Sequence, residues 1–538
     1  MEKRSLIAFL LAVLVIIYYP SYLKKFSPQK AQSATEITQL TESKAAPETV
    51  RPLTAPTPEA PVIIKMPDTP EEEVVINNSL MSVTFSSYDA SIKKIVLLNY
   101  FDKKGKPLEI ITPTAMQYRP FATTLPQSTS IYALSSDNNR VTCETTADDL
   151  KIIKTYEIGP DSYCIKAKFI MENVGEKDEI VPNYSVVIGT IFPGEESQSS
   201  TYLSATSLID DKPVKTKFGK QGFRTSSVGK VFWSGIKSKY FTAILLAQNS
   251  ASMATVTDYE TGGLRGVSGQ ITMPQVTIPK GGKAEEEFML YVGPKKYEIL
   301  KLLGLRLDEI MDFGMLAPIS KATLVLLNFF YKIVHNYGIA IILLTIMVYL
   351  VLYPLTLKSY KSMAEMQKIQ PYIQELQKKY KDDPKRQQKE MMLLYKEHKI
   401  NPLSGCFPML LQMPVLIALF NTLRSAIELR GAPFIFWIKD LSEPDVIFKF
   451  PNGFAIHLLP IILVAAFYFQ QKMTTAPAMT AEQAQQQKIM SNIMPLFMGF
   501  IFYSMPSGLN LYFGLSTTLG ILSQYKLRKA RTSPTLSK

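Results

Sequence analysis

The residues of this chain that could do chemistry in an unusual place are neutral polar side chains inside long, uncharged apolar stretches. They carry hydroxyl, phenol or amide groups and lie between residues 337 and 525: Thr345, Tyr349, Gln412, Asn421, Asn492, Asn510, Tyr512, Ser516 and Thr517. Any one such group in a membrane helix is explained by a hydrogen bond to a neighbouring helix. Their number, spread over four stretches, predicts instead a hydrated recess that can hold a polar segment of chain.

The groups that other kinds of chemistry require are missing from the sequence. No Asp or Glu lies inside these stretches, so a proton- or ion-coupled pump lacks its relay. His335, His398 and His457 lie far apart and show no metal-ligand spacing. The sequence has no phosphate-binding glycine loop, nucleophile elbow or paired His-Glu helix motif. We therefore expect no enzyme, no cofactor, no metal and no nucleic acid read by its sequence.

Membrane-spanning helices must position the polar side chains. The uncharged runs cover 337–357, 401–423, 450–471, 489–505 and 509–525. At the N-terminus, Lys3 and Arg4 precede an apolar run over 6–19, which is the form of a signal sequence. Because Tyr18, Tyr19, Pro20 and Tyr22 stand where a cleavage site needs small residues, residues 1–23 are predicted to stay as an uncleaved anchor. Six spans result, and five of them form a core over 336–525.

The distribution of charge predicts the orientation. Residues 358–399 hold 11 Lys and Arg against 6 Asp and Glu, and the tail 526–538 holds five cations and no acid. Basic loops stay in the cytoplasm, so this loop, the tail and, with an even number of spans, the N-terminus are expected there. The last two runs have only 17 residues each, about 26 Å of helix, against a hydrocarbon core of about 30 Å. Either the bilayer is thinned there or the helices continue past their uncharged residues.

The segment after the first span is expected on the outer side of the membrane, in two parts. Residues 24–73 are rich in Pro, Thr, Ala and Glu and predict a semi-extended tether. Residues 74–295 alternate like strands at 82–86, 92–96, 151–156 and 163–171, with Gly-containing turns between, which predicts an all-β sandwich. Cys143 and Cys164 lie in this domain and could pair in an oxidising compartment.

Two helical segments connect and extend the core. Residues 296–335 are predicted to connect the β domain to the core, and 319–334 carries Lys321, Asn328 and Lys332 as a polar stripe on an apolar helix. That pattern favours a helix lying in the membrane interface, and the alternative is a core helix of the outer domain. Residues 358–400 predict a helical hairpin with Asp383 as an N-cap. Its apolar seam is Met363, Met366, Ile369, Ile373, Leu376 and Tyr380, facing Met391, Leu394, Tyr395 and His398.

Several short sequence motifs resemble those of the YidC insertases of bacteria with two membranes. They are Tyr353-Pro354-Leu355-Thr356, Asn401-Pro402-Leu403-Ser404-Gly405-Cys406-Phe407-Pro408 with Gln412-Met413-Pro414, Trp437-Ile438-Lys439-Asp440-Leu441-Ser442, and Pro506-Ser507-Gly508-Leu509. The resemblance covers nearly the whole chain and is strongest after residue 313.

The resemblance implies a membrane insertase and chaperone that acts on nascent integral inner-membrane proteins, alone or with the Sec translocon. It implies a periplasmic super-β-sandwich and a five-helix core with a hydrophilic groove open to cytoplasm and lipid. Implied groove or path residues are Thr345, Gln412, Met413, Tyr512 and Phe513, beside the polar Tyr349, Asn492, Asn510 and Ser516. The hairpin, with Met363, Met366, Met391, Lys385 and Arg386, suggests contact with membrane lipid, nascent chains, the ribosome or the signal recognition particle receptor.

One position departs from the family pattern. The family commonly carries an Arg five residues before the Pro of the Tyr-Pro-Leu-Thr string, and Tyr349 stands there in this chain. A solute transporter and a membrane-anchored periplasmic binding protein remain the alternative interpretations. A transporter predicts internal repeats, which the sequence lacks, and an anchor does not need five further spans.

Overall fold

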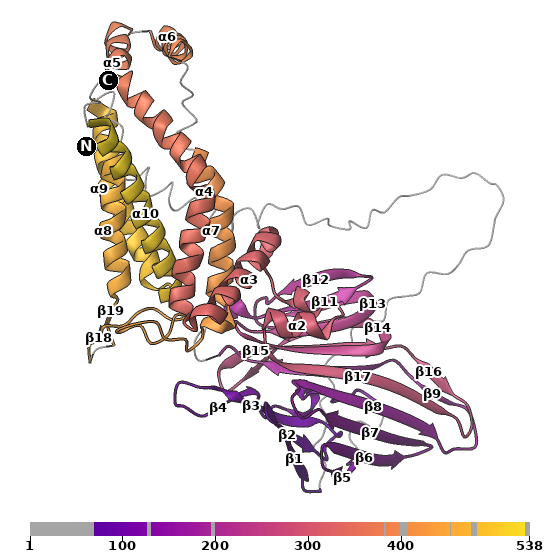
Figure 1. Cartoon of the computed structure of the whole chain (residues 1–538). Helices are drawn as coiled ribbons and strands as arrows, with labels where there is room; N and C mark the ends of the chain where they lie inside the picture. Colours follow the sequence, from indigo (N-terminus) through magenta and orange to yellow (C-terminus); the bar gives the residue numbers. More distant parts are fainter. Residues whose placement is uncertain are drawn as a thin grey trace, which may run out of the picture. The chain divides into compact units, whose positions relative to one another are not determined.

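The computed structural model describes residues 69–125, 131–194, 200–380, 383–398, 407–451, 453–474 and 481–532. The predicted anchor, almost all of the tether, the C-terminal end of the tail and Cys406 lie outside these residues. The side chains of Met363, Met366 and Gln412 are also outside the description. Strands occupy the described chain up to residue 294, and helices follow (Figure 1).

The predicted all-β domain is confirmed. Its strands are β1 (Glu73–Asn77), β2 (Met81–Ser86), β3 (Ile92–Phe101), β4 (Pro107–Ile111), β5 (Ala133–Asp137), β6 (Arg140–Ala147), β7 (Leu150–Ile158), β8 (Cys164–Asn173), β9 (Glu179–Val181), β10 (Tyr184–Ile191), β11 (Ser204–Ile209), β12 (Lys212–Lys217), β13 (Arg224–Lys237), β14 (Phe241–Thr261), β15 (Leu264–Met273), β16 (Val276–Ile278) and β17 (Lys283–Pro294). Alternate residues of β7 are buried, as the period of two in a half-buried strand requires.

The strands of the described chain form two main sheets. One has the order β1-β2-β3-β4, and the larger one runs β12-β11-β13-β14-β17-β8-β7-β6-β5, with β15 on β14 and β10 on β15. The long strand β14 pairs with β17 through its first half and with β15 through its second half. Gly262 and Gly263 turn β14 into β15 with φ of 55° and 77°, the conformation of a tight hairpin that favours glycine.

A disulfide between Cys143 and Cys164 is not formed, because both thiols are buried and free. Cys143 lies on β6 and Cys164 on β8, and β7 separates these strands in the sheet. Cys143 pairs across the sheet with Lys154 of β7, and Cys164 pairs with Tyr291 of β17. The strand predicted at 151–156 lies between the two cysteines in sequence, but the sequence alone did not show that it also lies between their strands in the sheet.

An ion pair is buried in the β domain. The Lys154 ammonium lies 2.8 Å from an Asp89 carboxylate oxygen, and the two side chains are 0% and 1% exposed. The Asp89 carboxylate also accepts hydrogen bonds from the amide and the hydroxyl of Thr123. The rings of Tyr132 and Phe169 lie 5.0 and 5.1 Å from the same ammonium. The ion pair is thus fully buried, and each of its two charges is compensated by the other rather than by water.

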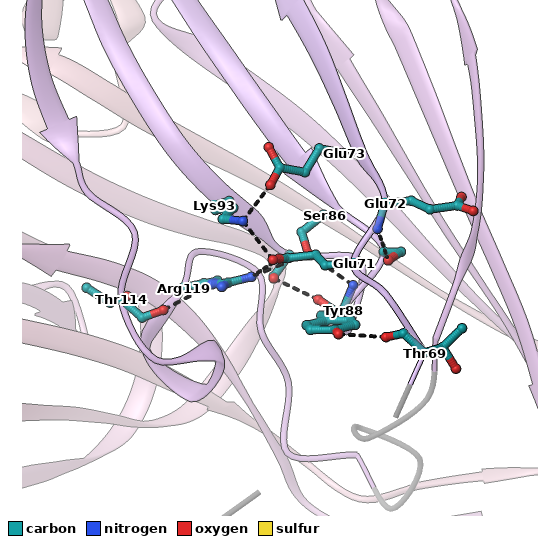
Figure 2. A network of polar contacts seen from close by, with 11 residues as sticks. Thr69, Glu71, Glu72, Glu73, Ser86, Tyr88, Lys93, Thr114 and Arg119 are labelled. Atoms are coloured by element: carbon teal, nitrogen blue, oxygen red, sulfur yellow. Dashed lines mark hydrogen bonds and ion pairs between the residues drawn. The ribbon is translucent and has the colours of Figure 1, made fainter. Parts of the chain in front are cut away.

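The chain enters the β domain through a network of polar contacts around Glu71 (Figure 2). The Glu71 carboxylate accepts from Lys93 at 2.7 Å, from Arg119 at 2.5 Å and from Ser86 at 2.6 Å. The Tyr88 hydroxyl donates to the Thr69 carbonyl at 2.7 Å. Residues 69–73, the last of the predicted tether, are therefore fixed against the first sheet.

The helices follow the β domain, with one small hairpin among them. They are α2 (Tyr297–Leu303), α3 (Ala317–Val334), α4 (Tyr337–Lys368), α5 (Gln370–Lys379), α6 (Pro384–Glu397), α7 (Phe407–Ser425), α8 (Leu458–Thr474), α9 (Ala481–Tyr503) and α10 (Ser507–Thr532), and the hairpin strands are β18 (Phe448–Lys449) and β19 (Ala455–Ile456). Figure 1 shows α8, α9 and α10 side by side and α4 next to α10. Leu327, Ile341, Leu419, Leu463 and Leu509 contribute to one buried apolar cluster from different helices.

The length of the helices bears on the predicted spans. Among the described residues, 317–334 and 337–358 are long and apolar enough to cross a membrane, and 458–472 and 492–503 are shorter apolar segments. The count of six spans stays a prediction. Helices α9 and α10 have 23 and 26 residues, so they continue past their uncharged runs. Thinning of the bilayer is therefore not required by the length of these two helices.

Two predicted segments differ in their bounds. The fourth predicted span begins at 450, but helix α8 begins only at Leu458, because β18, β19 and their turn occupy the preceding residues. The first helix of the predicted hairpin is broken at Ile369, where α4 ends and α5 begins with Pro371 in its first turn. Proline lacks the amide hydrogen that a continuous helix needs at this point.

The residues of the polar stripe predicted on helix α3 differ in exposure, because Lys332 is exposed and Lys321 is half-buried in an ion pair with Asp308. Asn328 is buried beside Leu324 and Leu327, which pack in the helical core rather than in the β domain. The opposite face is apolar and exposed at Val325, Phe329 and Ile333. The spacing of four between these residues places them on one side. The position of this helix in the membrane interface stays a prediction.

Candidate functional site

Tyr349, the residue at the position that departs from the family pattern, joins two helices. The Tyr349 hydroxyl on α4 lies 3.1 Å from the Leu519 carbonyl oxygen and 2.5 Å from the Ser523 hydroxyl oxygen, both on α10. A phenol has one proton and can also accept, so Tyr349 can donate to the carbonyl while Ser523 donates to it. Tyr349 therefore forms a neutral, hydrogen-bonded bridge between α4 and α10 at the position where the family resemblance implies a charged Arg.

Thr345 lies one turn before Tyr349 on α4. Its side chain is buried, and its hydroxyl donates to the Ile341 carbonyl oxygen of its own helix at 2.6 Å. The spacing of four puts Thr345 and Tyr349 on the same face of α4. The predicted path therefore has two neighbouring hydroxyls on this helix, and each is satisfied by a backbone acceptor.

Asn510 holds the turn between α9 and α10. Its amide group donates to the carbonyl oxygen of Phe502, in the last turn of α9, at 3.2 Å and to that of Met505, in the turn, at 3.4 Å. The Asn510 amide oxygen is buried without a hydrogen-bond partner among the described residues. A buried acceptor of this kind suits a position that water or a passing polar group reaches.

Two of the strings that carry the family resemblance meet at the same turn. The amide of Gly508 donates to the Leu441 carbonyl at 2.9 Å, and the Ser507 hydroxyl donates to the Asp440 carbonyl at 2.9 Å. A side chain at Gly508 would come within 3.1 Å of the Leu441 oxygen. The glycine thus permits the close approach that fixes the end of the α9–α10 pair.

The remaining predicted path residues are divided between buried and exposed positions. Tyr512 is buried, and the Phe513 ring packs 4.6 Å from the Phe502 ring of α9, centre to centre. Ser516 is half-buried on α10, whereas Met413 on α7 and Asn492 on α9 are exposed. The structure therefore places Thr345 and Tyr349 on one face of α4, with Tyr349 bonded to α10, but does not join them to Asn492 by any contact described.

Two neighbouring polar residues of α10, which the sequence analysis did not select, lie at or beside the contact with Tyr349. The Ser523 hydroxyl is hydrogen-bonded to the Tyr349 hydroxyl, and Gln524 is buried with a side-chain oxygen that lacks a hydrogen-bond partner among the described residues. Ser523 follows Ser516 by seven residues, so both lie on one side of α10. The seven-residue spacing of these two serines could have identified Ser523 from the sequence. It was not selected because it lies close to the basic tail.

The hairpin of α5 and α6 forms a small apolar seam of its own. Ile369 and Ile373 are buried against Met391, Leu394 and Tyr395, as predicted. The predicted N-cap is confirmed, since the Asp383 carboxylate accepts from the Arg386 amide at 3.1 Å.

Three other hairpin residues lie at its surface. His398 does not join the seam but lies against the exposed Tyr372 ring, 6.0 Å from centre to centre. Lys385 and Arg386 are exposed, and the Arg386 guanidinium lies 5.1 Å from the centre of the Tyr380 ring.

No group of three or more His, Cys, Asp or Glu residues in the described part of the chain is arranged to hold a metal ion. What the helical core offers is therefore a set of hydroxyl, phenol and amide groups next to exposed apolar surface. Leu350 and Val351 on α4 and Met413 and Ile417 on α7 are examples of that surface. Such an arrangement can bind and orient a chain without a covalent step.

Comparisons with known proteins cover both halves of the chain. The family model "YidC periplasmic domain" matches residues 73–326, and the family model "60Kd inner membrane protein" matches residues 329–534. The membrane protein insertase YidC of Syntrophus aciditrophicus is 32% identical over 98% of this chain and all of its own length. That of Pelobacter propionicus is 33% identical over 98% of this chain and 99% of its own. A solved structure of an active YidC insertase covers 98% of this chain and 99% of its own, at 21% identity and a TM-score of 0.36.

Proposed function

Because the chain belongs to the YidC family of membrane protein insertases, we propose that it guides client segments along a hydrated path beside α4 and α10. It is an inner-membrane protein with a periplasmic β domain, and it acts on nascent integral membrane proteins. The observation that carries the proposed path is the bridge from Tyr349 to Ser523 and Leu519, which gathers polar groups where two apolar helices meet.

The energetic task of the path is to lower the cost of carrying polar chain through hydrocarbon. Each backbone group without a hydrogen-bond partner costs several kcal/mol there. The buried acceptors of Asn510 and Gln524 and the hydroxyl of Ser516 can bind water or backbone amides in place of the lost solvent. A polar tail would then cross a shorter apolar distance.

The apolar part of a client needs a different surface. Met413 and Ile417 of α7 and Leu350 and Val351 of α4 are exposed and can contact a hydrophobic segment as it leaves the path for lipid. Methionine adapts to segments of different shape. Transfer of apolar area out of water supplies the driving force, so no nucleotide, cofactor or covalent intermediate is needed.

The proposal includes the orientation and the partners. Both termini and the α5–α6 hairpin would face the cytoplasm, where the exposed Lys385 and Arg386 suit contact with a ribosome, nascent chain, the signal recognition particle receptor or anionic lipid. Cooperation with the Sec translocon is part of the same proposal. Neutral Tyr349 would make the path less selective for acidic client tails than a path lined by Arg.

Reconstitution tests this function directly. The purified full chain is placed in liposomes, a short single-span client is synthesised outside, and insertion is measured as protease protection. We expect protected client only in vesicles that contain the chain. Equal protection in empty vesicles would contradict the insertase function for that client.

Water access tests the path separately. In a Cys406→Ser background, Ser516→Cys should react with a membrane-impermeant thiol reagent, whereas Leu344→Cys, buried in the apolar cluster, should not. If Ser516→Cys is as unreactive as Leu344→Cys while insertion still proceeds, the hydrated path is wrong and the insertase function stands.

A further inference from the structure

The connection from α7 to α8 presents large apolar side chains at the surface. Ile435, Phe436, Phe448 and Phe454 are 46%, 86%, 53% and 56% exposed. Phenylalanine side chains are normally withdrawn from water because their burial contributes about 1.5–3 kcal/mol each. Several on one connection therefore indicate that something apolar covers them.

This connection is held in shape by one buried carboxylate. Asp445 accepts from the Trp437 indole at 3.0 Å and from the amides of Leu458 and Leu459 at 2.9 and 3.0 Å. The first amides of α8 and a residue eight positions upstream of Asp445 are thus tied to the same group. The exposed rings project from an ordered frame rather than from a loose loop.

The backbone of Phe436 is strained. Its φ is 54°, in the left-handed region that bulky residues rarely adopt. Such a conformation costs on the order of 1–3 kcal/mol and persists where the surrounding structure enforces it. Here it holds an aromatic ring outward at 86% exposure.

The hairpin of β18 and β19 places three phenylalanine rings next to one another, with the Phe450 ring centre 6.0 Å from that of Phe454. Phe448 pairs with Ile456 across the hairpin, and the rings of Phe448 and Phe450 are 4.8 Å apart, centre to centre. The helix α8 begins two residues after β19 and exposes Ile461 and Ile462. The apolar surface of the hairpin therefore continues directly into that of α8.

The length of α8 suggests what lies over this surface. Its 17 residues reach about 26 Å, a few ångströms less than a hydrocarbon core of about 30 Å. The hairpin stands directly before the first turn of α8, where its apolar side chains can add to the apolar length of the helix. Aromatic rings favour this boundary between hydrocarbon and headgroups.

The charges beside the rings fit the same surface. Lys439 and Lys449 are exposed on the connection, while Glu443 is paired with Lys103 at 2.9 Å and Asp445 is buried. Cations beside an apolar ridge suit anionic headgroups above the hydrocarbon.

We propose that residues 435–451 and 453–456 form a lipid anchor, defined by Ile435, Phe436, Phe448, Phe450 and Phe454, that inserts into the leaflet at the α8 N-terminus. The anchor fixes the end of the helical core in the interface and extends the apolar reach of α8. It does not depend on the path beside α4 and α10. Lipid is favoured over a protein partner because the ridge is continuous with α8 and carries cations at its edge.

Depth-dependent quenching tests the anchor on the full chain in vesicles of zwitterionic and anionic phospholipid. In the Cys406→Ser background, Phe448→Cys and Phe454→Cys are labelled separately with an environment-sensitive fluorophore. The buried Cys143 and Cys164 do not compete for the label. Val228→Cys, 67% exposed on β13, is the matched control.

We expect both hairpin labels to shift to shorter wavelength and to lose emission with nitroxides carried near the lipid headgroup. Nitroxides at the end of the acyl chain should quench less, since interfacial insertion reaches only about 5–10 Å. The Val228→Cys label should respond to neither. Lys439→Glu with Lys449→Glu should reduce the quenching in anionic vesicles more than in zwitterionic ones.

Hairpin labels that are quenched no more than the Val228→Cys label would overturn the anchor. So would quenching that disappears when a client or a second copy occupies the surface, because a protein would then be the occupant. Neither result would alter the insertion measured in liposomes, so failure of the anchor is distinct from failure of the insertase function.

Discussion

The phenolic oxygen of Tyr349 on α4 lies 2.5 Å from the hydroxyl oxygen of Ser523 on α10, at the position where the resemblance to the family implies an Arg. A neutral bridge holds the two helices together where a charge would need water or a counter-ion. The same side chain therefore contributes both to helix packing and to the polarity of the proposed path.

Loss of the phenol should weaken both properties. We expect Tyr349→Phe and Ser523→Ala each to destabilise the α4–α10 contact by about 0.6–1.7 kcal/mol, the range for hydrogen bonds between membrane helices. Insertion yield in liposomes should fall with either change, and thermal unfolding in detergent measures the stability. Because both residues share one bridge, the double variant should lose less than the sum of the single losses. Additive losses would show that the bridge is not a unit.

The sequence predicted the elements that follow from periodicity. The strands at β2, β3, β7 and β8, the seam of the α5–α6 hairpin and the Asp383 cap all depend on residues near one another in sequence. The Tyr349–Ser523 bridge joins residues 174 positions apart, and no local pattern reports such a contact.

The start of α8 shows why boundaries were harder to predict. Residues 450–457 hold no Asp, Glu, Lys or Arg, like most of the helix after them, yet Ala455–Ile456 form strand β19 and the helix begins only at Leu458. The composition identified a stretch that suits lipid, but it did not reveal the backbone conformation of that stretch. A buried Asp445, thirteen residues before Leu458, sets the first turn of the helix.

The two cysteines of the β domain should remain thiols under oxidising conditions. Burial raises the pKa of the Cys143 thiol to about 12, which leaves almost no reactive thiolate at neutral pH. In the Cys406→Ser background we expect no thiol labelling in the native state, and labelling of both after denaturation. Reducing agent should leave the melting temperature unchanged. Mass spectrometry that finds a peptide linked between Cys143 and Cys164 would contradict the separation of β6 and β8.

Acid should loosen the junction between tether and β domain. Although burial acts to raise it, hydrogen bonds from Lys93, Ser86 and Arg119 and the charge of Arg119 hold the pKa of Glu71 at about 2, against 4.5 in the unfolded chain. The stabilisation is therefore complete above about pH 4.5 and is lost as the pH falls towards 2. Solvent screening of this partly exposed group reduces it to about 1 kcal/mol.

Hydrogen exchange of residues 69–77 measures this effect. Exchange should accelerate between pH 4.5 and 2 in the parent chain, after correction for the intrinsic pH dependence. Glu71→Gln should exchange faster at neutral pH and show little further change in acid. An unchanged pH profile in Glu71→Gln would assign the effect to another carboxylate.

The buried pair of Lys154 and Asp89 should be the most sensitive point of the β domain. Lys154→Met leaves the Asp89 carboxylate buried without its cation, a change that costs about 3–5 kcal/mol. Asn at position 89 can still accept from the Thr123 amide without a charge. Lys154→Met combined with Asp89→Asn should therefore recover part of the lost stability.

Labelling of Cys143 during denaturant titration reports this unfolding, because Cys143 pairs with Lys154 across the sheet. The midpoint should fall strongly in Lys154→Met and less in the double variant. Lys168→Met is the matched control, since Lys168 lies on the adjacent strand but is 41% exposed in its pair with Glu285. Its midpoint should stay near that of the parent. If Lys154→Met and Lys168→Met shift the midpoint equally, the uncompensated buried charge does not explain the loss of stability. The loss would then come from removing any lysine from the sheet.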